Sequence, residues 1–289
     1  MISIIIPTFN NLNYLKLCID SIKKNSKFDN EILLHINEGS DGTLDYAKNN
    51  KLKYTHSIEN EGLCIGCNKI SKKIRFDLIL YSHDDMYFCP SWDEVLINEL
   101  NIIKTNKFYL SSIMINADPK IKGHLNFDAG NTINNFNEKK LLENYKKLEH
   151  TDFQGSTWAP HLIHKDLWNE IGGFSEEFSP GVGSDPDLNF KLWKAGVRIF
   201  KGVAKSKVYH FGSITLRKNS QLNIKVNAGS RANKIFLNKW GVSIKFFKKH
   251  YLRSNTNYEG PLDEPIKNVY YYIDLIKVKL TYCYNYLLN

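Results

Sequence analysis

Residues 76–92 read FDLILYSHDDMYFCPSW, and the apolar run within this stretch ends abruptly in polar residues. A continuously apolar segment such as 78–81, bounded by polar residues, is typical of a central strand covered on both faces of a parallel sheet. Asp84 and Asp85 follow directly, and open α/β sheets bind ligands at the carboxyl ends of their strands. Two adjacent carboxylates repel each other, so a divalent cation with phosphate oxygens is a natural counter-charge. A turn that merely begins with Asp-Asp is the other interpretation.

The composition indicates a folded protein without a disulfide framework. The chain has 289 residues, 42% hydrophobic, which is enough for one large α/β domain or two small ones. Its five cysteines are scattered, and Cys64-x-x-Cys67 lacks the second ligand pair of a zinc site. The first residues, MISIIIPTFN, contain no basic leader, and no apolar run is as long as a spanning helix. We therefore expect a cytoplasmic protein.

The formal net charge of +9 raises the question of nucleic-acid binding, because Lys and Arg contacts to phosphates dominate such binding. The lysines, however, alternate with Asn and Ile along the whole chain. A solvated basic surface is the better interpretation, and no nucleic-acid partner is expected. A basic binding protein for nucleic acid or anionic glycan, with purely structural acids, stays open as an alternative.

Strands and helices alternate through the first hundred residues. Pro7 is expected to stop the first strand, and Asn11 or Asn13 to cap the helix that follows. The pattern predicts strands at 2–6, 31–36, 53–56 and 78–81, and helices at about 12–22, 43–47, 63–70 and 92–103, the last capped by Ser91. Such alternation predicts βαβ units and a mostly parallel central sheet flanked by helices, an α/β fold.

The second half of the chain is less regular. Residues 118–152 are rich in Asn and Lys and predict a surface excursion over the sheet edge. Further strands are predicted at 108–116, 159–164, 197–200 and 206–209, and helices at 138–148, 165–171, 186–193, 235–240 and 244–251. Residues 266–288 predict an amphipathic helix that packs on the body, with contact to a membrane surface, the inner face of the cell membrane, as the alternative.

Seven segments, in order and spacing, resemble glycosyltransferase family 2, the inverting transferases with a GT-A fold. They are SIIIPTFNN from Ser3, INEGSDGT from Ile36, NEG at 60–62 with Asn68, the pair Asp84-Asp85, GGFSEEF from Gly172, GSDPDLNFKLWKAG from Gly183, and VYHFGS from Val208. The resemblance covers about three quarters of the chain. It implies a GT-A catalytic domain at 1–215, with a nucleotide-binding half at 1–105 and an acceptor and catalytic half at 106–215. Residues 216–289 would form a mainly helical C-terminal extension.

The resemblance also implies a donor site for a UDP- or GDP-type nucleotide sugar. Its expected residues are Pro7, Thr8 and Asn10 in the nucleotide pocket, Asn37 and Glu38 where the family usually has an acidic pair for base and ribose, Asn68 in the donor region, and Asp84. Asn37 replaces an acid here, which leaves the base unassigned.

The metal and catalytic residues follow from the same resemblance. Asp85 matches the last acid of the family's D-x-D signature and His210 a late His near the metal, so both are expected ligands of Mn²⁺ or Mg²⁺. His83 stands where the first acid is expected; Asp84 is the possible substitute, while His83 caps the turn or touches phosphate. If His210 binds the cation directly, Mn²⁺ is favoured, because imidazole suits transition metals.

Asp185 matches the family's general base, and Asp187 its downstream acid on the acceptor side. Asp185 precedes a predicted helix, whose dipole and free amides would favour the charged carboxylate, although simple capping would also explain an Asp there. Trp158 is the best aromatic candidate for acceptor contact. The predicted reaction is inverting sugar transfer to the hydroxyl of a glycan or lipid-linked acceptor, with a sugar nucleotidyltransferase as the alternative enzyme.

Overall fold

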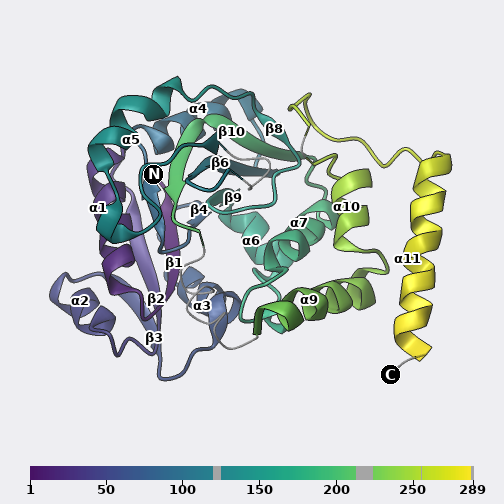
Figure 1. Ribbon diagram of the computed structural model, residues 1–289, viewed down its shortest axis with the longest axis horizontal. Coiled ribbons are helices and arrows are strands. Elements are labelled where there is room, and N and C mark those ends of the chain that lie inside the picture. The colour runs from purple at the N-terminus through teal and green to yellow at the C-terminus, as the bar shows by residue number, and fades with distance from the viewer. Residues whose placement is uncertain (120–124, 213–223, 255, 288–289) are drawn as a thin grey trace.

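A 10-stranded mixed sheet runs through the molecule in the order β3-β2-β1-β4-β9-β6-β10-β5, with β7 beside β6 and β8 beside β10 (Figure 1). The computed structural model describes residues 1–119, 125–212, 224–254 and 256–287. The strands are β1 Ser3–Phe9, β2 Glu31–Asn37, β3 Lys53–Ser57, β4 Leu78–Tyr81, β5 Met86–Phe88, β6 Phe108–Asn116, β7 Leu125–Asn126, β8 Phe153–Gln154, β9 His161–His164 and β10 Ile199–His210. The α-helices are α1 Leu12–Asn25, α2 Thr43–Asn49, α3 Gly62–Ser71, α4 Trp92–Ile103, α5 Glu138–Asn144, α6 Lys165–Ile171, α7 Ser184–Lys194, α9 Ile224–Trp240, α10 Ile244–His250 and α11 Val269–Leu287.

The first four strands form the parallel half of the sheet, as the sequence predicts. β1 pairs in parallel with β2 on one side and with β4 on the other, and β2 pairs with β3. The apolar residues of β1, β2 and β4 are almost completely buried, and α3 packs against β1 and β2. The carboxyl ends of these parallel strands therefore lie at one edge of the sheet.

Pro7 does not stop the first strand, contrary to the prediction, because β1 continues to Phe9. The C=O of Ile5 accepts a hydrogen bond from the N–H of Ser82 on the β4 side. Backbone groups two residues apart face the same side of a strand, so Pro7 also faces β4. The β1–β4 pairing ends at Ile5 opposite Tyr81, so the missing N–H of Pro7 removes no ladder hydrogen bond.

Antiparallel strands make the sheet mixed. β9 lies antiparallel between β4 and β6, and the short strand β5, which the sequence pattern did not reveal, runs antiparallel to β10. The predicted strands 197–200 and 206–209 are one strand, β10, whose register against β6 shifts between Val203 and Lys207. This long strand carries His210 to the same edge of the sheet as the residues after β4.

The predicted excursion at 118–152 packs on the body in the residues that the structure describes. Tyr14 of α1 accepts a hydrogen bond at its hydroxyl from the N–H of Ile133, and Lys24 pairs with Glu138 at 2.9 Å. Leu141 and Tyr145 are buried in a second apolar cluster. The helix predicted at 138–148 ends earlier as an α-helix, at Asn144, and continues as a 3₁₀ turn.

The C-terminal helices α9 and α10 attach to α7 through packed aromatic rings. Phe190 of α7 packs against Phe236 of α9 and Phe247 of α10, both fully buried. α11 lies farther out, beside α10 (Figure 1), and contacts it through Tyr271 and Asp274. In the described ranges, no helix is long and apolar enough to cross a membrane.

Most of the apolar side chains of α11 point away from the body. Tyr271 and Val278 are buried against the body, whereas Ile273 and Ile276 are 43% and 59% exposed. The prediction that this segment packs on the body therefore holds for one narrow side of the helix, and its opposite side is left open.

Candidate active site

The candidate site lies where the parallel strands end. Thr8 belongs to the end of β1, Asn37 ends β2, and the residues 82–85 follow β4. Because β1, β2 and β4 are adjacent and parallel, these positions come together at one edge of the sheet.

Asp84 is held by residues of the first strand and helix. Its Oδ2 accepts a 2.6 Å hydrogen bond from Thr8 Oγ1, and its Oδ1 accepts a 3.1 Å hydrogen bond from Asn11 Nδ2. Asn11 occupies the predicted cap position of α1, but its side chain makes no capping hydrogen bond. Burial, and then the charge of Asp85, raise the pKa of Asp84 to about 7. Asp84 thus faces Thr8 and Asn11.

Asp85 lies instead with two histidines. Ligand atoms of His83, Asp85 and His210 all lie within 4.8 Å of one another. His210 Nε2 is 3.4 Å from Asp85 Oδ1, and His83 Nδ1 is 4.0 Å from the same oxygen. The backbone fixes this approach, because the N–H of Phe211 donates to the C=O of Asp85. The predicted ligands Asp85 and His210 are therefore brought together, and His83, not Asp84, completes the group.

The His83-Asp85-His210 group suits a transition metal ion. Within the described part of the chain, the buried Nε2 atom of His210 has no hydrogen-bond partner, as expected of a nitrogen reserved for a ligand. Burial lowers the pKa of His83 to about 4, so its ring is neutral at pH 7 and able to bind a cation. Two imidazoles and a carboxylate favour Mn²⁺ over Mg²⁺, which prefers oxygen ligands.

His83 is the residue of this group that the sequence analysis leaves without a single role, since capping of the turn and phosphate contact are both open. His83 and Asp85 are two residues apart, and both lie close to His210, whereas the intervening Asp84 is held by Thr8 and Asn11. That spacing was the available signal. The expectation of an acid at this position obscured it.

Asp185 lies inside the first turn of α7, as the residue after Ser184, and not before the helix as predicted. Its Oδ1 atom is buried and without a hydrogen-bond partner among the residues that the structure describes. Burial raises the pKa of Asp185 to about 7, and the positive charge of Lys248 opposes this rise in part. Desolvation therefore outweighs the preference of a helix terminus for the charged carboxylate. A carboxylate with a pKa near neutrality is suited to general-base chemistry.

Tyr81 packs against His83 and is also affected by the charge of Asp185. Its ring lies 5.5 Å from that of His83, between ring centroids. Burial first, and then nearby charges that include Asp185, raise the pKa of Tyr81 well above its usual range. Since Tyr81 ends β4, Asp185 and His83 both lie near the end of this one strand.

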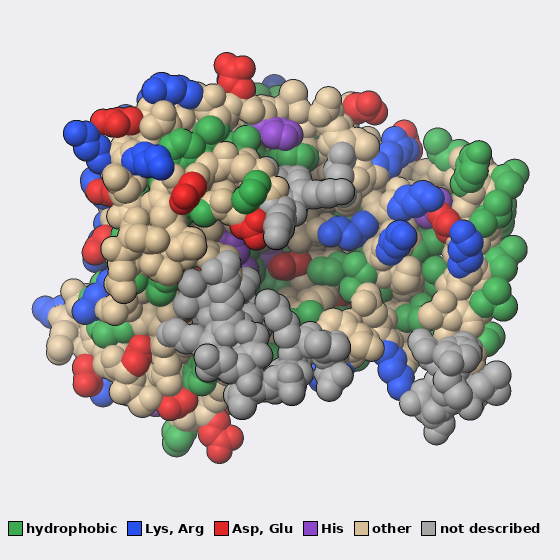
Figure 2. All heavy atoms as spheres, in the orientation of Figure 1, with side chains coloured by type: hydrophobic (Ala, Val, Ile, Leu, Met, Phe, Trp, Pro, Cys, Tyr) green, Lys and Arg blue, Asp and Glu red, His purple; other side chains and the backbone are tan. Residues whose placement is uncertain are grey.

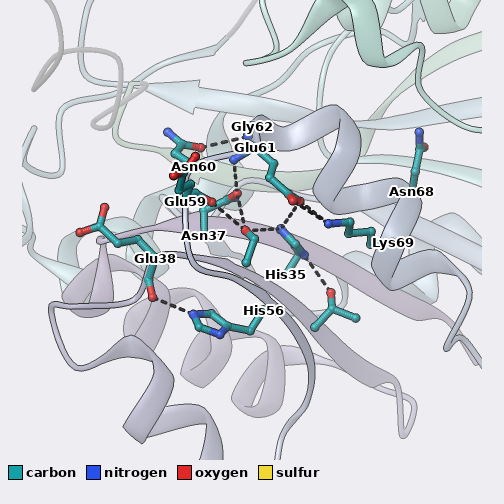
Figure 3. Close-up of polar contacts among 12 residues, drawn as sticks. His35, Asn37, Glu38, His56, Glu59, Asn60, Glu61, Gly62, Asn68 and Lys69 are labelled. Carbon is teal, nitrogen blue, oxygen red and sulfur yellow. Dashed lines mark hydrogen bonds and ion pairs between the residues drawn. The ribbon is translucent and has the colours of Figure 1, made fainter.

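The residues expected to bind the base and ribose lie at the ends of β1 and β2 or in the loops that follow these strands. Asn37 Oδ1 accepts a 2.9 Å hydrogen bond from the N–H of Glu61, inside the polar cluster in Figure 3. Asn10 Oδ1 accepts from the N–H of Gly39, which ties the two loops together. Glu38 is exposed, and its carboxylate points away from this cluster (Figure 3). Asn37 thus stabilises the loops after β1 and β2, and Pro7 and Glu38 lie at the edges of these loops.

Asn68 lies apart from these loops (Figure 3). Its amide exchanges two hydrogen bonds with the backbone of Phe174, at 2.8 and 2.9 Å, and also donates to Glu176 Oε1 at 3.2 Å. These contacts connect α3 to the loop after α6. The structure therefore gives Asn68 a connecting position, and does not bring it to the donor loops.

Neither of the two residues expected to bind the acceptor has a fully exposed side chain. Asp187 is 0% exposed and accepts a 2.8 Å hydrogen bond from Trp240 Nε1, so it connects α7 to α9. Trp158 is half-buried, packs edge-on against Phe153, and donates from Nε1 to the C=O of Ser112. Both side chains therefore make hydrogen bonds within the protein.

The mixed, mostly parallel sheet with flanking helices is the GT-A class of nucleotide-sugar transferase folds. Residues 3–166, more than half of the chain, match the model of glycosyl transferase family 2. The chain belongs to that family.

Curated relatives are described as glycosyltransferases. An uncharacterized glycosyltransferase of Rickettsia bellii is 27% identical over 236 residues, which are 79% of this chain and 32% of that protein. Another, of Rickettsia typhi, is 28% identical over 217 residues, 72% of this chain and 64% of that protein. The chain thus spans about a third of the first relative's length.

Solved structures with the same fold include two with bound ligands. GalNAc-T7 with UDP, GalNAc and Mn²⁺ has a TM-score of 0.55 and 17% identity, over 73% of this chain and 43% of that one. Residues 1–349 of S. aureus TarS with UDP-GlcNAc have a TM-score of 0.52 and 14% identity, over 82% of this chain and 70% of that one. At these identities the likeness concerns the fold.

Proposed function

We propose that the protein is a metal-dependent inverting glycosyltransferase, with residues 1–215 as the catalytic part and 216–289 as an extension. Within 1–215, residues 1–105 would bind the nucleotide and 106–215 the acceptor. The observation that carries the proposal is the buried carboxylate of Asp185, with a pKa of about 7, near the strand end that holds His83, Asp85 and His210.

The chemistry assigns these residues two tasks. His83, Asp85 and His210 would hold Mn²⁺, which neutralises the negative charge that develops on the leaving diphosphate. Asp185 accepts the proton of the acceptor hydroxyl, whose oxygen attacks the anomeric carbon as the bond from that carbon to the diphosphate oxygen breaks. A single displacement from the opposite face inverts the anomeric centre.

The donor is a UDP- or GDP-type nucleotide sugar in this proposal, and UDP is the first to test. Pro7, Thr8, Asn10, Asn37 and Glu38 would line the base and ribose region. Solved neighbours of the same fold were obtained with UDP and UDP-GlcNAc, which supports a uridine nucleotide. The sugar nucleotidyltransferase and the basic binding protein are less well supported, because the family match favours sugar transfer.

The acceptor is a glycan or a lipid-linked glycan, and the exposed face of α11 supports the lipid-linked form. Val269, Ile273, Ile276 and Leu280 recur at helical spacing and are 71%, 43%, 59% and 65% exposed. The exposed Lys277 and Lys279 flank this apolar stripe. A helix with this arrangement would lie on an anionic bilayer surface, with its apolar side in the acyl boundary. Ile276→Glu would then reduce sedimentation with phosphatidylglycerol vesicles, whereas Lys139→Ala, on α5, would not.

A thermal-shift panel tests the donor assignment. Nucleotides and nucleotide sugars are added with and without Mn²⁺, and a ligand that binds the native state raises the unfolding temperature. We expect a UDP sugar to stabilise the protein only when Mn²⁺ is present. If every nucleotide sugar left the unfolding temperature unchanged with Mn²⁺, the proposal would fail. The anomeric configuration of the product, read by NMR, tests inversion.

A further inference from the structure

A cavity of about 720 Å³ lies between α9, α10 and the segment that follows α10. Its lining is cationic and polar: Asn233, Ile244, Lys245, Lys248, Lys249, Arg253, Ser254 and Thr256. No acidic residue is among these. Figure 2 shows Lys and Arg side chains gathered over α10 on this face of the molecule. A volume of this size is typical of small-molecule sites.

The positive charges of this basic cavity are balanced by the protein only in part. Lys249 pairs with Asp274 of α11 at 2.6 Å. The ion pairs found across the described ranges include none with Lys245, Lys248 or Arg253. Like charges held together repel one another, so the cavity is set up to accept an anion.

The basic cavity lies next to the candidate base. Lys248 lines the cavity, and its charge affects the pKa of Asp185. Asn233 also lines it, and the preceding residue Ala232 closely approaches Gly183 at the start of α7. Two helices thus bring the cavity wall to the helix turn that carries Asp185.

The cavity wall that contains Ser254 is connected to α7 through hydrogen bonds to residues 155 and 156. Ser254 Oγ donates a 2.8 Å hydrogen bond to the C=O of Gly155, and the C=O of Ser156 accepts one of 3.3 Å from Asn189. Asn189 lies four residues after Asp185 and therefore on the same face of α7. The cavity and Asp185 thus share one side of α7.

We propose that the basic cavity binds a phosphate group of the acceptor and so directs a neighbouring acceptor hydroxyl toward Asp185. This inference rests on the proposed function, because it takes Asp185 as the base. Phosphate is favoured over a monoanion since several cations converge, and Arg and Lys form strong charge-assisted hydrogen bonds with phosphate oxygens. The phosphate belongs to a soluble phosphodiester glycan or to a lipid headgroup.

Inorganic phosphate is the first probe, at constant ionic strength. Its binding is followed by NMR through the backbone amides of Ser254 and Thr256, which line the cavity. Lys245→Ala/Arg253→Ala is expected to weaken binding at these amides by roughly tenfold or more, because two charge-assisted contacts are lost. Lys139→Ala removes an exposed lysine on α5 and is the matched control, with unchanged binding.

Unchanged phosphate binding in the double variant, or shifts confined to residues outside the cavity, would overturn the inference. Glycerol phosphate and vesicles with or without phosphatidylglycerol then separate the two sources. Binding that depends on Lys245 and Arg253 supports the inference, and the preferred probe identifies the source. Donor binding with Mn²⁺ is measured in the same wild-type preparation. Its absence defeats the proposed function, whereas donor binding without phosphate binding in the cavity defeats only this inference.

Discussion

His210 Nε2 lies 3.4 Å from Asp85 Oδ1, although the two residues are far apart in the sequence. The contact depends on the sheet, because β5 pairs with β10 so that Met86 lies opposite His210. The short strand β5 directly follows Asp85. The His83-Asp85-His210 group is thus built by strand pairing and not by a local motif.

The first prediction concerns this group. Asp85→Ala and His210→Ala should each weaken Mn²⁺ binding by at least about 100-fold, since even outer-shell partners of metal ligands contribute 10- to 100-fold. His83→Ala should do the same, which would distinguish the structure's ligand set from one that contains Asp84. Isothermal titration with Mn²⁺ measures the effect. His150→Ala, which removes an imidazole stacked on Phe153, should bind Mn²⁺ as the wild type does.

Thr8→Val tests how Asp84 is held. The variant keeps the shape of the side chain but removes the 2.6 Å hydrogen bond to the buried Asp84 carboxylate. We expect the free energy of unfolding to fall by about 1–3 kcal/mol, the usual cost of leaving a buried polar group unsatisfied. Urea denaturation measures it. Thr281→Val removes an exposed hydrogen bond to Lys277 and should have little effect; equal losses in both variants would contradict a special role for the Asp84 contact.

Asp185→Asn tests the base without changing the volume of the side chain. Transfer should fall by roughly 10²- to 10⁴-fold, the usual contribution of a general base, while donor and Mn²⁺ binding persist. Initial rates with a competent acceptor, and donor binding in parallel, measure the two effects. Transfer at the wild-type rate would remove Asp185 from the mechanism.

The raised pKa of Asp185 also predicts how rate and stability depend on pH. The base acts only when it is ionised, so the rate should rise with pH and level off above about 7. The folded protein holds this proton more tightly than the unfolded chain, whose Asp pKa is about 4. Ionisation therefore destabilises the fold progressively between about pH 4 and 7. Asp185→Asn should raise the unfolding temperature at pH 8, by a margin that shrinks as the pH falls to 4.

The sequence predicts the local elements well where one strong pattern acts. β4, β6, α4 and α6 begin and end at the predicted residues, because an apolar run or helical spacing with clear end signals defines each. β5 has three residues, and its existence depends on pairing with β10, far along the chain. Sequence periodicity carries no information about such a partner.

Motifs likewise predict some residues of the candidate site, whereas the positions of others depend on the fold. Asp85, His210 and Asp185 are predicted from ordered motifs, and the structure brings Asp85 and His210 together after β4 and at the end of β10. Asp187 has a motif position next to the base, but helix geometry turns it toward α9, where it accepts from Trp240. The basic cavity draws on α9 and α10, which no motif connects with Asp185.

Gly66 and Gly229 offer a matched test of how closely α3 approaches the sheet under the nucleotide loops. Both lie within helices, where alanine is favoured over glycine by about 0.5–1 kcal/mol. A Cβ at Gly66 would lie 2.3 Å from the ring of His35, which is fully buried and bonded to Thr55, whereas a Cβ at Gly229 meets nothing within 4 Å. Gly66→Ala should therefore lower the free energy of unfolding by about 1–3 kcal/mol, the usual penalty for an overpacked core. Gly229→Ala should raise it slightly. Because His35 lies on β2, two residues before Asn37, Gly66→Ala should also weaken nucleotide binding; stability and binding equal to those of Gly229→Ala would contradict this close packing.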